Sequence, residues 1–127
     1  MDLSIVIVNW NVKDLLRNCL QSLLDACQVN PSLTTEIIVV DSASTDGSPQ
    51  MVHAQFPQVH LIASDKNLGY AGGNNTGAAA ARGRYIFLLN PDTVVQSDAL
   101  TQMVNYMDAH PETGALGPQL LWPDGSG

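Results

Sequence analysis

The 127-residue sequence is poor in cysteine, in cationic side chains and in aromatic residues. Its two cysteines are too few for a disulfide-stabilised secreted domain, and on one expected helix Cys19 and Cys27 lie too far apart to bond to each other. Five Lys and Arg residues against twelve Asp and Glu residues give a formal net charge of −7. This charge excludes the basic surface of a nucleic-acid-binding protein and a polybasic membrane patch.

Long hydrophobic runs are also absent. No stretch approaches the roughly 20 apolar residues that span a bilayer, and the opening residues MDLSIVIVNWN lack the pattern of a signal peptide. Hydrophobic residue types nevertheless make up 45% of the sequence, which excludes intrinsic disorder, and the length fits one ordinary domain. We therefore expect a single cytoplasmic domain without a transmembrane segment.

Apolar patterning predicts alternating strands and helices. Apolar runs predict buried strands at residues 3–8, 36–40 and 85–89, a further strand at 59–63 and a candidate fifth strand at 114–121. Helical spacing predicts helices over residues 12–27, up to about 56, over 78–82, and from a cap at Ser97 to about 109. This order predicts an α/β fold of Rossmann-like type, a mostly parallel sheet with helices on both faces.

Polar residues follow three of the predicted strands. Asn9, Asp41 and Asp92 stand at strand ends, and ligands of such sheets bind at that edge. Asp41 is either an acceptor for a ring N–H or a ribose hydroxyl, or a turn residue. Asp92, with the Asn90 side chain nearby, is either a ligand of Mg²⁺ or Mn²⁺ or part of a plain Asn-Pro-Asp turn.

The glycine-rich residues 69–77 are a candidate ligand-binding loop ahead of a helix, because glycine permits positive φ and close backbone approach. The segment is not the dinucleotide fingerprint, since it follows the third strand rather than the first, and it lacks the P-loop Gly-Lys-Ser/Thr. Trp10 and Tyr70 either stack on a base or pack against the sheet. The three histidines have no metal-ligand spacing, and no nucleophile elbow is present.

Three motifs together resemble a known family. SIVIVNWN, IIVVDSASTDGS and NLGYAGGNNTGAAAARGRYIFLLNPDT are similar, in order and spacing, to the N-terminal half of a family 2 inverting glycosyltransferase of GT-A fold. The resemblance covers essentially the whole chain, and the Asn-Pro-Asp-Thr motif is most similar to rhamnosyltransferase-type members that build bacterial surface polysaccharides. It implies transfer of a sugar, with rhamnose a candidate, from a UDP- or TDP-sugar to a hydroxyl of a saccharide or lipid-linked saccharide acceptor.

The resemblance also implies residue roles. Those assigned to nucleotide-sugar binding are Val8, Asn9, Trp10, Asp41, Asn67, Gly69 and Asn75, with Asp41 on the base. Asp92, helped by Asn90, would hold Mn²⁺ or Mg²⁺ on the diphosphate. Two departures stand out: Asn90-Pro91-Asp92 has one carboxylate fewer than Asp-x-Asp, and Asn74 replaces an arginine of many members.

The resemblance assigns no catalytic base within these residues. In the family the base comes later in the chain, so we expect it beyond Gly127, and neither Glu112 nor Asp124 fits that role. The resemblance therefore implies the donor-binding part of a longer protein, peripheral at the inner membrane face, with an exposed sheet edge that favours self-association.

Two other functions remain as alternatives. The first is a nucleotide-binding module without catalysis. The second, a nicotinamide-dependent oxidoreductase, would need a glycine fingerprint after the first strand, where the sequence has Asn-Trp-Asn-Val. The oxidoreductase is therefore the weaker of the two.

Overall fold

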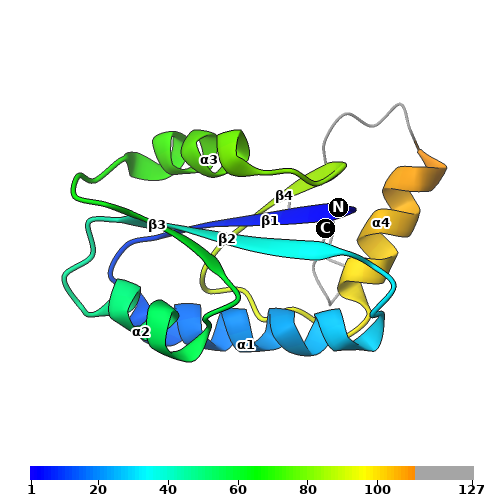
Figure 1. The fold of residues 1–127 in the computed structure, drawn as a ribbon, viewed down its shortest axis with the longest axis horizontal. Helices are drawn as coiled ribbons and strands as arrows, with labels where there is room; N and C mark the ends of the chain where they lie inside the picture. The colour runs from blue at the N-terminus through cyan, green and yellow to red at the C-terminus, as the bar shows by residue number, and fades with distance from the viewer. Residues whose placement is uncertain (111–127) are drawn as a thin grey trace.

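A computed structural model describes residues 1–110, which form a sheet with helices on both faces (Figure 1). The elements in chain order are β1 (Leu3–Asn9), α1 (Lys13–Val29), β2 (Thr35–Ser42), α2 (Ser48–Gln55), β3 (His60–Ser64), α3 (Gly69–Ala80), β4 (Tyr85–Leu89) and α4 (Ala99–Ala109).

Three of the sequence-based predictions lie outside the described residues. They are the candidate strand at 114–121, the rejection of Glu112 and Asp124 as catalytic base, and the expectation of a base beyond Gly127. The position of the base therefore stays a prediction.

All four strands are parallel, in the order β3-β2-β1-β4. The chain steps outward from β1 through β2 to β3, then crosses back over the sheet to place β4 on the other side of β1. The direction of winding therefore changes between β1 and β4, and ligands of open parallel sheets bind at the carboxyl ends of the strands beside such a switch point. The predicted fold class is confirmed.

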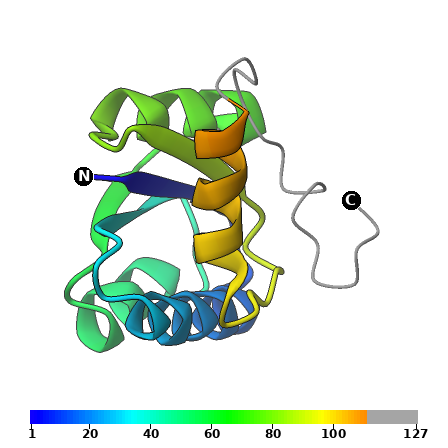
Figure 2. The same ribbon diagram turned by 90° about the vertical axis from the view of Figure 1, so that its right-hand side faces the viewer.

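One face of the sheet is covered by α1 and α2, which lie below it in Figure 2. Leu3, Ile5 and Ile7 of β1 point to this face, because alternate residues of a strand share a face. They pack against large buried side chains of α1, and the apolar face of α4 joins the same core. The buried contributions of the two helices are Leu16, Cys19, Leu20, Leu23 and Ala26 from α1, and Leu100, Met103, Val104 and Met107 from α4.

Among residues 1–110, the opposite face is covered by α3, which lies above the sheet in both views (Figures 1 and 2). In this part of the chain the buried apolar cluster on that face contains three residues, Val6, Ile38 and Val40. Helix α3 packs against these residues through glycine. A Cβ added to Gly77 would lie 2.3 Å from Val6 Cγ1. The helix can lie this close to the sheet only because that Cβ is missing.

The glycine-rich segment was expected to be a loop ahead of a helix at 78–82, and this prediction was wrong. Residues 69–80 are themselves helix α3, and of its glycines only Gly69, the first residue, has a positive φ, of 70°. Glycine has a low intrinsic helix propensity, but close packing on the sheet outweighs it here. The segment's glycines serve helix–sheet contact more than loop conformation.

Two boundary predictions also need correction. Helix α4 begins at Ala99 after Asp98, and no side chain caps it, so Ser97 is not its cap. Strand β3 runs one residue later than expected, because its pairing with β2 starts at His60. Within residues 1–110, none of the helices combines the length and the apolar character that crossing a bilayer requires.

Candidate functional site

A groove of about 390 Å³ opens at the carboxyl edge of the sheet. Its lining residues come from the end of β1, the end of β2, the start of α3 and the turn after β4: Val8, Trp10, Val12, Ser42, Asn67, Gly69, Tyr70 and Pro91. The volume is within the usual range for small-molecule sites. Three strand ends meet at this groove, but Asn9, Asp41 and Asp92, the polar residues expected to point into one crevice, are not among its lining residues.

Two aromatic side chains line the groove and are largely exposed. Trp10 follows β1 and is 56% exposed, whereas Tyr70 lies in the first turn of α3 and is 57% exposed. Neither packs in the core, so the alternative that they serve as sheet packing is not what the structure shows. Exposed aromatic faces beside a groove are suited to stacking on a planar ring.

Ser42 fastens the start of α3 to the sheet. Its hydroxyl accepts a hydrogen bond from Leu68 N at 2.6 Å and donates to Asn67 Oδ1 at 3.2 Å. Gly69 N donates to the same Asn67 oxygen at 2.9 Å. Ser42 was not among the residues predicted from the sequence; the available signal was its place at the strand end next to Asp41, on the other face of the pleat.

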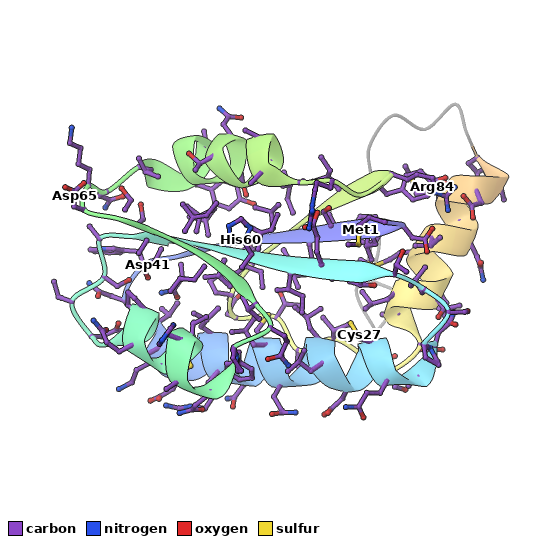
Figure 3. The ribbon with its side chains drawn as sticks, in the orientation of Figure 1. Met1, Cys27, Asp41, His60, Asp65 and Arg84 are labelled. Atoms are coloured by element: carbon purple, nitrogen blue, oxygen red, sulfur yellow. The ribbon has the colours of Figure 1, made fainter. Side chains whose placement is uncertain are left out.

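Asn9 and Asp41 form a second hydrogen-bond network, on the α1 side of the sheet. Asn9 Nδ2 donates to Asp41 Oδ1 at 2.9 Å, and Ser44 N donates to Asp41 Oδ2 at 3.0 Å. The Ser44 hydroxyl is 3.3 Å from Asn9 Nδ2 and accepts from Asn11 N at 2.9 Å. Both Asp41 oxygens are therefore engaged within the protein, at the end of the sheet seen in Figure 3.

Neither Asn9 nor Asp41 lines the groove, and both are almost fully buried. The network holds two loops in strained conformations: Asn11 has a φ of 53° and Ala43 a φ of 61°. Such a conformation costs a non-glycine residue of order 1–3 kcal/mol and persists only where neighbours enforce it. Trp10 lies between the two anchored residues Asn9 and Asn11, so the network fixes the backbone that presents the indole to the groove.

The Asn90-Pro91-Asp92 motif lies directly after β4, beside the groove. Pro91 lines the groove, Asp92 is exposed, and Thr93 N donates to the Asn90 carbonyl at 3.2 Å. Burial, and then the charge of Asp92, raise the pKa of the Cys19 thiol to about 12, so Cys19 stays protonated. Residues 1–110 contain no cluster of three or more metal-ligating side chains.

These residues nevertheless fit a divalent cation bound together with a diphosphate. Hard cations such as Mg²⁺ and Mn²⁺ take oxygen ligands, and Mg²⁺ sites commonly use one or two carboxylates plus substrate phosphates and water. Asp92 is an exposed carboxylate that follows directly on Pro91, which lines the groove. It requires the phosphate oxygens of a ligand to complete such a site.

Some of the remaining predicted site residues line the groove, and others do not. Val8, Trp10, Asn67 and Gly69 are brought together in the groove, whereas Asn75 is exposed on α3 and does not line it. Asn74, which replaces the family's arginine, is buried in α3. A role for Asn75 stays a prediction.

Comparison with known protein families gives a match over nearly the whole chain. The model of the family described as "Glycosyl transferase family 2" matches residues 4–126. A succinoglycan biosynthesis protein, ExoO of Rhizobium meliloti, is 38% identical over 109 residues, which are 85% of this chain and 30% of that protein. The N-acetylglucosaminyl-diphospho-decaprenol L-rhamnosyltransferase of Mycobacterium tuberculosis is 33% identical over 110 residues, 75% of this chain and 36% of that protein. The chain thus spans about a third of the length of these relatives.

Solved structures share the fold. S. aureus TarS 1-349 in complex with UDP superposes with a TM-score of 0.73 at 26% identity, covering 87% of this chain and 33% of that chain. The mannosyltransferase PcManGT from Pyrobaculum calidifontis, in complex with GDP-Man and Mn²⁺, superposes with a TM-score of 0.72 at 24% identity, covering 83% of this chain and 32% of that chain. The second likeness shows the fold alone.

Proposed function

The chain belongs to glycosyl transferase family 2, and from this premise we propose that it is the donor-binding part of a bacterial polysaccharide glycosyltransferase. The observation that carries the proposal is the groove at the carboxyl edge of the sheet, lined by the exposed Trp10 and Tyr70 and by Pro91, which directly precedes the exposed Asp92. An aromatic groove next to an accessible carboxylate matches the two ends of a nucleoside diphosphate held with a divalent cation.

In this proposal the base stacks against Trp10, and the groove residues Val8, Asn67 and Gly69 contact the rest of the nucleotide. The buried Asn9–Asp41 network acts one layer behind, because it fixes the two loops that carry and flank Trp10. We therefore assign Asp41 to this supporting role, in place of the direct contact with the base that the resemblance implied.

Asp92 would hold Mn²⁺ or Mg²⁺, with Asn90 beside it, and a bound cation supplies charge neutralisation for the departing diphosphate. In the proposed reaction an acceptor hydroxyl attacks the anomeric carbon, the bond from that carbon to the nucleoside diphosphate breaks, and configuration inverts. The hydroxyl proton passes to a base that we assign to no described residue and expect beyond Gly127.

The donor is proposed to be a UDP- or TDP-sugar, and rhamnose is the proposed sugar. The similarity to ExoO and to a rhamnosyltransferase supports polysaccharide synthesis and, more distantly, that sugar. A saccharide or lipid-linked saccharide is the proposed acceptor, and a lipid-linked one would bring the protein to the inner face of the membrane.

Calorimetric titration tests the donor site. UDP, TDP and GDP are titrated into the 127-residue chain with and without Mn²⁺, and into Asp92→Ala and Trp10→Ala. We expect Mn²⁺ to tighten binding in the native chain but not in Asp92→Ala. Trp10→Ala should weaken binding about tenfold or more, because a base–aromatic stack contributes about 1–3 kcal/mol.

Asp65→Ala is the matched control, because Asp65 is another exposed carboxylate at the same end of the sheet (Figure 3). It should keep the Mn²⁺ effect. Binding that ignores Mn²⁺ would leave a nucleotide-binding module without the metal role, and the absence of binding by a folded chain would contradict the donor site altogether.

A further inference from the structure

We propose that Gly73 is a positioning residue: its contact with Val8 sets the distance between α3 and β1, and thereby the width of the groove between Tyr70 and Trp10. In the proposed function, this space holds the nucleobase. This inference rests on the proposed function and adds to it the residue that sets the size of the space for the base.

The contact leaves no room for any side chain at position 73. A Cβ added to Gly73 would lie 2.6 Å from Val8 Cγ1, 2.7 Å from Val8 Cγ2 and 3.2 Å from Val8 Cβ. Separations below about 3 Å are well inside the normal carbon–carbon contact of about 3.5–4.0 Å. One methyl group at this position must therefore move one of the two elements.

Rotation of the Val8 side chain cannot relieve the overlap. Both γ-carbons are close and the β-carbon itself is within 3.2 Å, so a new rotamer exchanges one close atom for another. Valine is also stiff at χ1 because it is branched at Cβ. β1 is the inner strand between β2 and β4, so the element that moves is α3.

The same contact is continuous with the groove. Val8 lines the groove as well as touching Gly73, and Trp10 follows it on the same strand. On the helix, Tyr70 lies one turn before Gly73 and also lines the groove. A shift of α3 away from Val8 therefore moves Tyr70 away from Trp10 and widens the space between them.

Gly77 provides a matched control on the same helix. Its added Cβ would lie 2.3 Å from Val6 Cγ1 and 3.2 Å from Val40 Cγ2, so the overlap is at least as severe. Neither valine lines the groove. Gly77 is two turns from Tyr70 whereas Gly73 is one turn away, so a shift at Gly77 displaces the far end of the helix more than it displaces Tyr70.

The experiment compares Gly73→Ala and Gly77→Ala in the 127-residue chain. Unfolding is followed by circular dichroism, and affinity for the tightest of UDP, TDP and GDP is measured with Mn²⁺ present. Both variants should lose stability, but Gly73→Ala should also weaken nucleotide binding about tenfold, as expected for a lost base stack, with Gly77→Ala close to the native affinity. Quenching of Trp10 fluorescence by the nucleotide, in a Trp122→Phe background, should fall only in Gly73→Ala.

A double variant covers the case in which Gly73→Ala does not fold. Val8→Ala removes both close γ-carbons, so Gly73→Ala combined with Val8→Ala should fold and bind no more weakly than Val8→Ala alone. Equal affinities of Gly73→Ala and Gly77→Ala, or a double variant that folds without recovering binding, would overturn the inference. A native chain that binds none of the three nucleotides would instead refute the proposed function.

Discussion

The two faces of the sheet are built by opposite means. The face under α1, α2 and α4 is packed with large side chains, and twenty buried residues form one cluster there. The face under α3 has only three buried residues in its cluster and reaches close contact through glycines. The first face is held together by apolar volume, and the second by the absence of side chains at the contact.

The pleat divides the polar residues in the same way. Asn9 and Asp41 point to the α1 side and bond to each other, whereas Ser42 points to the α3 side and bonds to the start of α3. The groove lies with the second set. We call the face under α1, α2 and α4 the thick face and the face under α3 the thin face. The thick face therefore supplies rigid support, and the thin face supplies the surface that a ligand can reach.

The largest effect is expected from removing volume on the thick face. Leu20→Ala should lower the free energy of unfolding by about 3 kcal/mol, because a fully buried leucine leaves a cavity that the surroundings only partly fill. Urea denaturation measures it. Leu15→Ala, on the exposed side of the same helix, is the control and should change stability by less than about 0.5 kcal/mol. Similar losses in both variants would mean that this core is not what the structure describes.

On the thin face, adding volume should be the damaging change. Gly77→Ala should cost about 2 kcal/mol, the usual size of an overpacking strain. Gly72→Ala, in the same helix, meets only Leu68 Cβ at an ordinary 3.4 Å and should stabilise α3 by up to about 1 kcal/mol through higher helix propensity. Thermal unfolding of Gly77→Ala and Gly72→Ala measures both changes in stability. A Gly77→Ala variant more stable than the native chain would contradict close packing of this glycine on the sheet.

The polar networks sharpen the comparison further. Asp41→Asn should lower the free energy of unfolding by about 1–3 kcal/mol, because a buried carboxylate that accepts from Asn9 and Ser44 is replaced by an amide that cannot accept at both positions.

Ser42→Ala should lower the free energy of unfolding by about 1 kcal/mol. It should weaken nucleotide binding more than this loss of stability suggests, since it frees the start of α3. Asp25→Asn, at an exposed position of α1, is the control for charge removal. Denaturation should show the larger loss of stability in Asp41→Asn, and titration should show the larger loss of nucleotide affinity in Ser42→Ala. Asp25→Asn should stay close to the native chain in both measurements.

The smallest expected effect is a change in stability at low pH, through Glu36. Burial alone would raise the pKa of Glu36, but hydrogen bonds from Ser4 Oγ and Arg82 N, with the Arg82 charge, hold it below its ordinary value of 4.5. A lowered folded-state pKa contributes stability that is complete above pH 4.5 and is lost as pH falls through the folded value. Glu36→Gln should therefore be less stable than the native chain near neutral pH, and the difference should shrink below pH 4.5. A constant difference across that range, in denaturation at several pH values, would exclude this linkage.

Much of the fold could be predicted because the apolar runs are short, β-branched and regularly spaced. The runs around Ile5, Val39 and Phe87 predicted buried parallel strands, and all three are central or well-buried parts of the sheet. The helix at 69–80 could not be predicted in the same way. Its stability depends on where Val6 and Val8 lie in space, and no local pattern in a glycine-rich segment reports that contact.

The candidate site shows the same limit. The family resemblance assigned Val8, Trp10, Asn67 and Gly69 to one binding site, and the structure places them around one groove. The strand-end rule instead pointed to Asn9 and Asp41, which do not line that groove. It could not separate Asp41 from Ser42, because two adjacent residues at the end of a strand point to opposite faces and the motif does not say which face holds the groove.

The sequence by itself determined the order of strands and helices, the parallel sheet and the sheet edge that carries the candidate site, since these depend on periodicity and on the chemistry of strand ends. Only the tertiary structure decided which side of that edge is open. The crossover that returns the chain to β4 places α3 on one face, and its glycines bring it close enough to form a groove wall with Val8. On the other face the large side chains of α1 fill the space, so the Asn9–Asp41 pair is buried there as support.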